Sequence, residues 1–132
     1  MYKLEKPLYH GTSKASAMYI YSYGFKAPVY LTEDKQAAFH YAKAATAYLE
    51  HEAKENGHKL IADGWAVFTF RSVPNKINLV LDNYNSQAEP GQWKYERPIR
   101  GLAHFTAQYG ELEVTDEERL YLQCFAIGMW RH

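Results

Sequence analysis

Residues 8–13 of the chain are Leu8-Tyr9-His10-Gly11-Thr12-Ser13, a short apolar run followed by a glycine and two hydroxyl side chains. The run predicts a strand that ends at Gly11, because apolar and aromatic residues favour strands and glycine interrupts them. Either hydroxyl can then accept a hydrogen bond from the first turn of a helix over residues 14–23. Gly24 follows, where a helix cap favours a left-handed backbone. The stretch therefore predicts a strand followed directly by a helix.

A second unit of the same kind follows along the chain. Val29-Tyr30-Leu31 predicts another short strand, and Thr32 is placed to cap the next helix. Residues 33–56 are rich in alanine and glutamate, which favour helices, and Gly57 marks the end of this helix. The many alanines predict close packing of this helix against a sheet.

The second half of the chain predicts mostly strands. Apolar runs at 66–70 and 77–81 are typical of buried strands, the alternation over 111–114 of a half-exposed one, and the run at 120–127 of another buried strand. Residues 83–101 predict a long loop, and loops of this length in a small domain are often functional. Two strand–helix pairs followed by strands predict an α+β fold.

The composition limits the class of protein. The 132 residues fit one compact domain over residues 1–132, and the 47% hydrophobic content is enough to form a core. The 15 basic and 15 acidic residues give a net charge of zero, which excludes a uniformly basic coat for nucleic acid. Cys124 is the one cysteine, so no internal disulfide forms, and we expect it to be a small core residue of the strand at 120–127. With no apolar span or secretory signal in the sequence, we expect a cytoplasmic protein that does not bind membranes.

Three segments, taken in order, resemble the ADP-ribosyltransferase fold of the poly(ADP-ribose) polymerase and diphtheria-toxin type, whose signature triad is His-Tyr-Glu. Residues 8–13, with the helix end at 20–25, are similar to the family's aromatic-His-Gly-Ser/Thr strand and the helix after it. Residues 29–32 with Tyr41 are similar to its second motif, because Tyr41 follows Tyr30 by eleven positions. Residues 109–114 are similar to the strand that supplies its glutamate.

The resemblance implies a split β-sandwich of two small antiparallel sheets with flanking helices and an NAD cleft between the sheets. It implies mono-ADP-ribosyl transfer from NAD to a macromolecular acceptor, either protein or nucleic acid, with release of nicotinamide. NAD is then a substrate, and no metal is needed. A short catalytic domain of this kind looks like a bacterial or phage toxin or effector. NAD hydrolysis, an RNA 2′-phosphotransferase-like reaction, and a catalytically inactive module that binds NAD or ADP-ribose are the alternatives.

The resemblance also assigns roles to residues of the first two segments. His10 would bind the adenosine ribose, and the Gly11 backbone would hold the nicotinamide amide, with Thr12 beside it. Tyr30 and Tyr41 would stack on the two faces of the nicotinamide ring. His10 and Tyr30 are thus the first two members of the expected catalytic triad.

A carboxylate is the third member, because the ribose becomes an oxocarbenium-like cation as nicotinamide leaves. The resemblance favours Glu111. Glu113 stays open as the alternative, since it lies on the same face of the expected strand and the Glu-x-Glu spacing is similar to that of arginine-modifying members. The expectation from strand patterning alone is that both are solvent-exposed edge charges.

The loop before the glutamate segment contains aromatic and basic residues, among them Trp93, Arg97 and Arg100. Such side chains can stack on bases or bind phosphates, and the resemblance implies that this loop selects the acceptor. A solvated loop with one buried tryptophan is the alternative. His51, Glu52 and Glu55 lack the spacing of a zinc site and a further ligand, so we expect no metal there.

Overall fold

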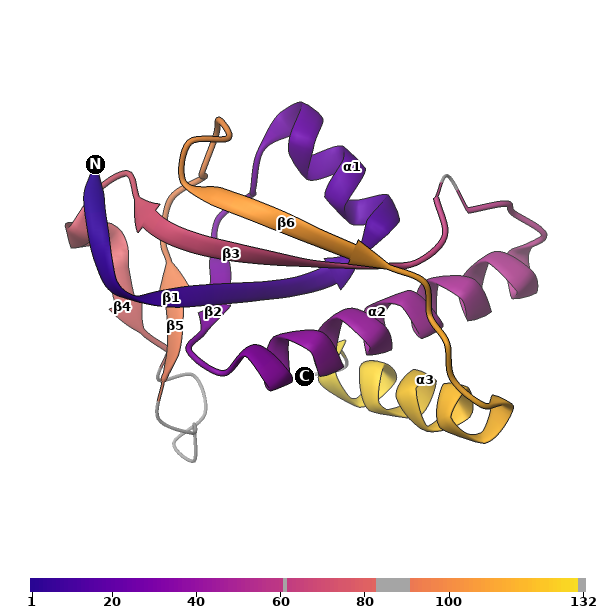
Figure 1. Ribbon diagram of the computed structural model, residues 1–132. Coiled ribbons are helices and arrows are strands. Elements are labelled where there is room, and N and C mark those ends of the chain that lie inside the picture. Colours follow the sequence, from indigo (N-terminus) through magenta and orange to yellow (C-terminus); the bar gives the residue numbers. More distant parts are fainter. Residues whose placement is uncertain (61, 83–90, 131–132) are drawn as a thin grey trace.

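The computed structural model describes the chain except residues 61, 83–90 and 131–132. The described residues form six strands, three α-helices and one 3-10 helix, which confirms the α+β class (Figure 1). In chain order they are β1 (Tyr2–Ser13), α1 (Lys14–Tyr23), β2 (Val29–Thr32), α2 (Lys35–Asn56), β3 (Trp65–Val73), η1 (Lys76–Asn78), β4 (Leu79–Leu81), β5 (Gln92–Tyr95), β6 (Phe105–Gly110) and α3 (Asp116–Trp130).

The strands form one antiparallel sheet in the order β4-β5-β2-β1-β3-β6. The longer strands β1, β3 and β6 make one half of it, and the short strands β2, β5 and β4 make the other. The halves are joined where Tyr9 of β1 pairs with Thr32 of β2. The prediction of two separate sheets is therefore wrong. Tyr9 pairs with Thr32 along one edge of β1 and with Thr69 of β3 along the other edge, which joins the six strands into one sheet.

The main core lies on the face of the sheet that α1 covers in part, and Phe25 and Ile99 extend it beyond the helix (Figure 1). Phe25, Phe68 and Phe105 form its centre, with ring centroids 5.0–5.4 Å apart in edge-to-face geometry. Such aromatic pairs stabilise a fold beyond the burial of their area. Ser13 caps α1, since its hydroxyl oxygen accepts the Ser16 N–H at 3.1 Å. The predicted helix over residues 14–23 is confirmed.

The opposite face of the sheet is covered by α2, and α3 packs on the outer side of α2 (Figure 1). Ala38 and Ala42 are fully buried against Val67 of β3, so the predicted close approach of an alanine-rich helix is confirmed. Asp34 caps this helix in place of Thr32. The contact between α2 and α3 buries Ala44, Ala47, Leu122 and Ala126. Glu50 of α2 forms an ion pair with Arg119 of α3 there.

The predicted strand over 120–127 is wrong, because these residues belong to the helix α3. The overlooked signal precedes the apolar run. Thr115 Oγ1 accepts the Glu118 N–H at 3.1 Å, and the first turn holds three acidic residues, which favour a helix N-terminus. Cys124, expected in a buried strand, is exposed on this helix.

Three shorter segments also differ from the prediction. Residues 111–114 form no strand, because β6 ends opposite Trp65, the first residue of β3, and its partner strand extends no further. Residues 77–81 begin in the 3-10 helix η1 and continue as β4. The expected long loop contains β5 at 92–95. The strand at 66–70 is confirmed as part of β3.

Candidate functional site

The first two sequence motifs meet where β1 and β2 pair. The His10 Nδ1 of β1 lies 2.7 Å from the backbone oxygen of Tyr30 on β2. A carbonyl oxygen can only accept, so we assign the proton to Nδ1, which leaves Nε2 of the neutral ring as an acceptor. The ring packs edge-on against Phe25, with centroids 5.2 Å apart. The imidazole is thus held by a backbone group and by the core, and we call this place the β1–β2 junction.

The surroundings of His10 keep its ring neutral. Burial in this aromatic environment lowers the pKa of His10 below its ordinary value of 6.5, and the hydrogen bond to the Tyr30 carbonyl opposes that effect only in part. At neutral pH the site therefore offers a hydrogen-bond acceptor at Nε2 and no positive charge from this residue.

A cavity of about 270 Å³ lies beside the imidazole, between α1 and the start of β2. It contains one ammonium group, that of Lys26, and no carboxylate. The lining combines apolar, aromatic and small polar side chains: His10, Ser16, Tyr19, Ile20, Gly24, Phe25, Lys26, Pro28 and Val29. Such a cavity suits a ligand with a planar ring and an anionic group.

Beyond Tyr9, β1 pairs with β3 but no longer with β2 among the described residues. One edge of β1 at Gly11 and Thr12 therefore has no strand partner in the described part of the sheet. The face of Gly11 is covered by α2, because a Cβ at this position would overlap the backbone carbonyl of Ala38. The glycine thus allows α2 to approach, and we expect any ligand contact of Gly11 to involve its backbone edge.

The strand β5 places two polar residues beside the second motif. In the register of β2 with β5, Tyr30 pairs with Lys94, and Thr32 pairs with Gln92. The Gln92 Nε2 donates to Thr32 Oγ1 at 3.0 Å. Sequence reasoning did not assign a role to Gln92. The alternation of polar and aromatic residues over 92–95 is the signal that could have placed it on a strand.

The two tyrosines expected to enclose the nicotinamide lie in different surroundings. Tyr30 is 53% exposed on β2, so its ring is accessible to a ligand. Tyr41 lies on α2, where its ring stacks on Phe125 of α3 with centroids 6.1 Å apart. Thr12 is half-buried on β1 opposite Ala66. Since Tyr9 pairs with Thr32, the Tyr30 ring lies on the sheet face opposite to the His10 ring. The structure thus brings the His10 ring to the Tyr30 backbone carbonyl but not to the Tyr30 ring, and it directs Tyr41 toward the α2–α3 interface.

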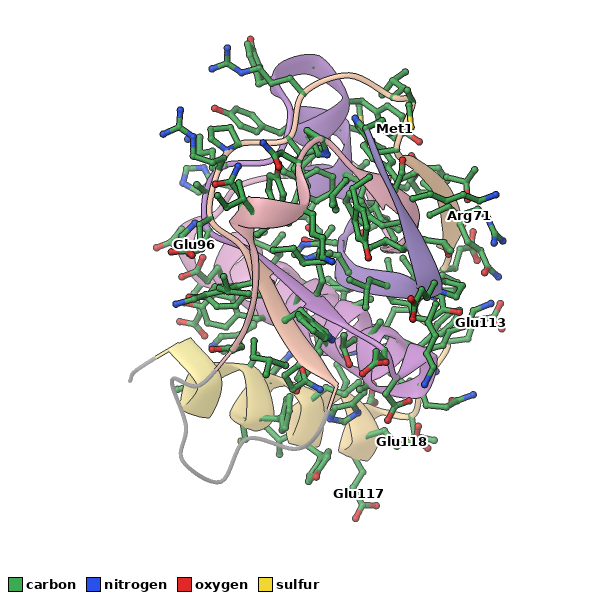
Figure 2. All side chains as sticks on the ribbon, turned by 90° about the vertical axis from the view of Figure 1, so that its left-hand side faces the viewer. Met1, Arg71, Glu96, Glu113, Glu117 and Glu118 are labelled. Atoms are coloured by element: carbon green, nitrogen blue, oxygen red, sulfur yellow. The ribbon has the colours of Figure 1, made fainter. Side chains whose placement is uncertain are left out.

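The structure does not bring Glu111 or Glu113 to the β1–β2 junction. Ala107 of β6 is level with His10 across β3, so Glu111 is two strands away and four residues further along. Strand geometry separates their Cα atoms by roughly 16 Å. Glu113 is exposed and lies toward α3 in Figure 2.

Glu111 belongs instead to a second cavity, of about 480 Å³, at the end of β6. Its backbone oxygen accepts the Trp65 Nε1–H at 3.0 Å. Burial raises the pKa of the Tyr109 phenol there, and the hydrogen bond with Tyr21 raises it further. The lining is Lys14, Glu50, Asp63, Gly64, Tyr109, Gly110, Glu111 and Leu112.

The three residues expected to bind the acceptor are also separated. Trp93 lies on β5 and packs against the main core, as a partly buried side chain. Arg97 and Arg100 are exposed in the connection between β5 and β6. This connection returns to α1, because Phe25 and Ile99 exchange two backbone hydrogen bonds of 2.8 and 3.1 Å.

The lowered pKa of His10 predicts how stability depends on pH. Between the folded and unfolded pKa values the unfolded state binds more protons, so the stabilisation is complete above about pH 6.5 and is lost as the pH falls. His104 acts in the same direction, because burial and the nearby N-terminal charge lower its pKa. We expect the free energy of unfolding, measured by denaturant titration, to decrease from about pH 7 to about pH 5, and to decrease less in His10→Phe. A stability that rises on acidification through this range would contradict the assignment.

Two further classes of site find no support. Within the described residues, no three His, Cys, Asp or Glu side chains lie together as a metal site would require. None of the helices described is both long and apolar enough to cross a membrane. Comparisons with protein-family models, with curated proteins and with solved structures give no match to this chain.

Proposed function

We propose that the protein binds NAD at the β1–β2 junction and transfers ADP-ribose from it to a macromolecular acceptor, with release of nicotinamide. The observation that carries the proposal is the hydrogen bond between His10 Nδ1 and the Tyr30 carbonyl, at 2.7 Å. This bond joins the histidine of the first motif to the backbone of the tyrosine of the second. It lies beside the cavity whose aromatic side chains and Lys26 ammonium suit a ligand with a planar ring and an anionic group. The proposal includes kinship with the ADP-ribosyltransferase family, with the six strands joined in one continuous sheet.

The groups at the junction match the parts of NAD. The neutral His10 Nε2 can accept a hydrogen bond from a ribose hydroxyl, and the Lys26 ammonium can bind the pyrophosphate. The open edge of β1 beside Gly11 offers backbone groups to the nicotinamide carboxamide, which has the donor and acceptor of a peptide group. The exposed ring of Tyr30, on the sheet face opposite to the His10 ring, can stack on a nicotinamide held at the open edge of β1.

Cleavage requires the bond between nicotinamide and the ribose to break before or as the acceptor attacks. Nicotinamide leaves as a neutral base, so no acid has to protonate it, but positive charge develops on the ribose. On the sheet face of Tyr30, β5 supplies the side chain of Gln92 and no carboxylate. An amide oxygen stabilises a developing cation less than a carboxylate does, so we expect slow turnover.

This reasoning predicts that Gln92→Glu increases nicotinamide release. The substitution keeps the length of the side chain and adds a negative charge near the ribose, which we expect to raise kcat by about tenfold or more. Steady-state nicotinamide release measures the change. Gln108→Glu, on β6, is the matched control, because it adds the same charge at a distance from the junction. Equal rates for Gln92→Glu and the unmodified protein would place the reacting ribose elsewhere.

A second candidate function is binding of NAD or ADP-ribose without catalysis. The amide of Gln92 and the ammonium of Lys94, in the register of β2, favour this candidate, because both are suited to binding an anionic ligand. NAD hydrolysis and an RNA 2′-phosphotransferase-like reaction would use the same β1–β2 junction. Analysis of the products distinguishes them from ADP-ribosyl transfer.

The test of the proposal is nicotinamide release from NAD by the purified protein, with and without a cell lysate. Release that depends on lysate, together with label transfer from NAD to a macromolecule, is the expected result. Release without lysate would indicate hydrolysis or self-modification. Measurable NAD binding with no release under either condition would favour the binding module and would contradict the transferase.

A further inference from the structure

The charges of this neutral chain are unevenly distributed along the sequence. No acidic residue lies between Glu5 and Glu33, or between Glu96 and Glu111. The first interval contains α1, and the second contains the connection to β6. The bridge between Phe25 and Ile99 brings the two intervals together on the α1 side of the sheet (Figure 1). Lys26 and Arg100 each follow one residue of this bridge, so it brings them close together, and neither interval contains a carboxylate.

One third of the 15 acidic residues are concentrated in a short segment away from this bridge. Residues 111–118 contain five acidic residues in the segment leading into α3. In Figure 2, Glu113, Glu117 and Glu118 lie on the α3 side of the molecule, away from α1. At the start of α1, Lys14 shares a cavity with Asp63 and Glu111, so the excess of positive charge lies at the other end of this helix, near Lys26 and Arg100. This asymmetry, in a protein whose net charge is zero, favours an anionic partner at the C-terminal end of α1.

Exposed aromatic rings accompany these cations. Tyr19 and Tyr23 are 47% and 68% exposed, and their ring centroids are 4.7 Å apart. The Lys26 ammonium lies over the Tyr19 ring, 5.2 Å from its centroid. Arg100 packs beside Gly24, the residue that follows Tyr23, since a Cβ built on Gly24 would be 3.0 Å from the Arg100 Cγ. We call Tyr19, Tyr23, Lys26 and Arg100 the tyrosine–cation strip.

We propose that the tyrosine–cation strip binds a single-stranded nucleic acid. Aromatic rings next to cations are the arrangement that binds such strands, because bases stack on the rings and phosphates pair with the cations. In a duplex the faces of the bases are already stacked and cannot use the tyrosines. Tyr19 also lines the cavity beside His10, so a bound strand lies next to the β1–β2 junction. Resting on the proposed function, this position makes nucleic acid the acceptor of the ADP-ribose.

The test is fluorescence anisotropy of the full chain with labelled oligouridylate and oligothymidylate of about 12 nucleotides, without NAD. We expect binding that weakens with salt, and an increase of about tenfold in the dissociation constant for Tyr23→Ala. The double variant Lys26→Ala, Arg100→Ala should reduce the slope of log K against log salt by about 0.7 for each cation removed.

Two matched controls separate the strip from general effects. Tyr121→Ala removes a tyrosine that is 65% exposed on α3, and Lys54→Ala removes an exposed cation at the end of α2. Both should bind the oligonucleotides as the unmodified protein does. Absence of binding at low salt, or equal losses in the strip and control variants, would overturn the proposal, and label transferred only to protein in a lysate would identify a protein partner instead. Because this binding is measured without NAD, it can succeed or fail independently of nicotinamide release.

Discussion

Replacing Gly11 by alanine is expected to lower the free energy of unfolding by about 3 kcal/mol or more. The added Cβ would overlap the backbone carbonyl of Ala38, and a backbone group in a buried helix cannot turn aside as a side chain can. Either α2 moves away from β1 or the strand bends, and both changes open the packing of Ala38 and Ala42. A loss of this size is a large part of the stability of an ordinary domain.

Denaturant titration of the variant measures this loss, and Gly128→Ala is its control. Nothing lies within 4 Å of a Cβ at Gly128, which is part of α3, so alanine there should stabilise the helix by about 0.5–1 kcal/mol. If Gly11→Ala were as stable as Gly128→Ala, α2 would not lie on β1 as described, and other residues would cover that face of the β1–β2 junction.

The second large effect is expected for His10→Phe. Phenylalanine preserves the ring that packs against Phe25 and Phe68, but it removes both the donor to the Tyr30 carbonyl and the acceptor at Nε2. We expect kcat/KM for nicotinamide release to fall by about 100-fold or more, because the ribose is no longer held in position. Circular dichroism should show an unchanged fold, which separates this effect from unfolding.

Glu111→Gln is the informative comparison for His10→Phe. Since Glu111 lines a different cavity from His10, its loss should leave kcat/KM within about twofold of the unmodified protein. The opposite pattern, with activity lost in Glu111→Gln and kept in His10→Phe, would move the reaction to the cavity at the end of β6.

The elements that depend on local sequence were predictable. The helices over 14–23 and 33–56 and the strand at 66–70 follow from caps, alanine content and apolar runs, which act within a few residues. The run at 120–127 is ambiguous, because its apolar residues suit a buried strand as well as the buried face of a helix. Two features favour the helix: the cap that Thr115 and Glu118 form at its start, and the packing of its apolar face against α2. The second of these is a tertiary contact, which local patterning does not contain.

The candidate site was predictable only for residues on strands that are neighbours both in the chain and in the sheet. His10 and Tyr30 lie on strands that are consecutive in the chain and adjacent in the sheet, so their motifs meet. Gln92 lies on the sheet face of Tyr30 because β5 pairs with β2, and Glu111 is separated from His10 because β3 lies between β1 and β6. Strand order is set by the packing of the whole sheet, so neither placement could be read from the motifs themselves.

The most direct test is a titration of the ¹⁵N-labelled protein with NAD, followed by the backbone amide chemical shifts. The proposed site predicts the largest changes at Tyr9–Gly11, at Tyr30–Thr32 and around Lys26, with small changes at residues 109–112. Changes concentrated at residues 109–112, or no changes at saturating NAD, would contradict binding of NAD at the β1–β2 junction.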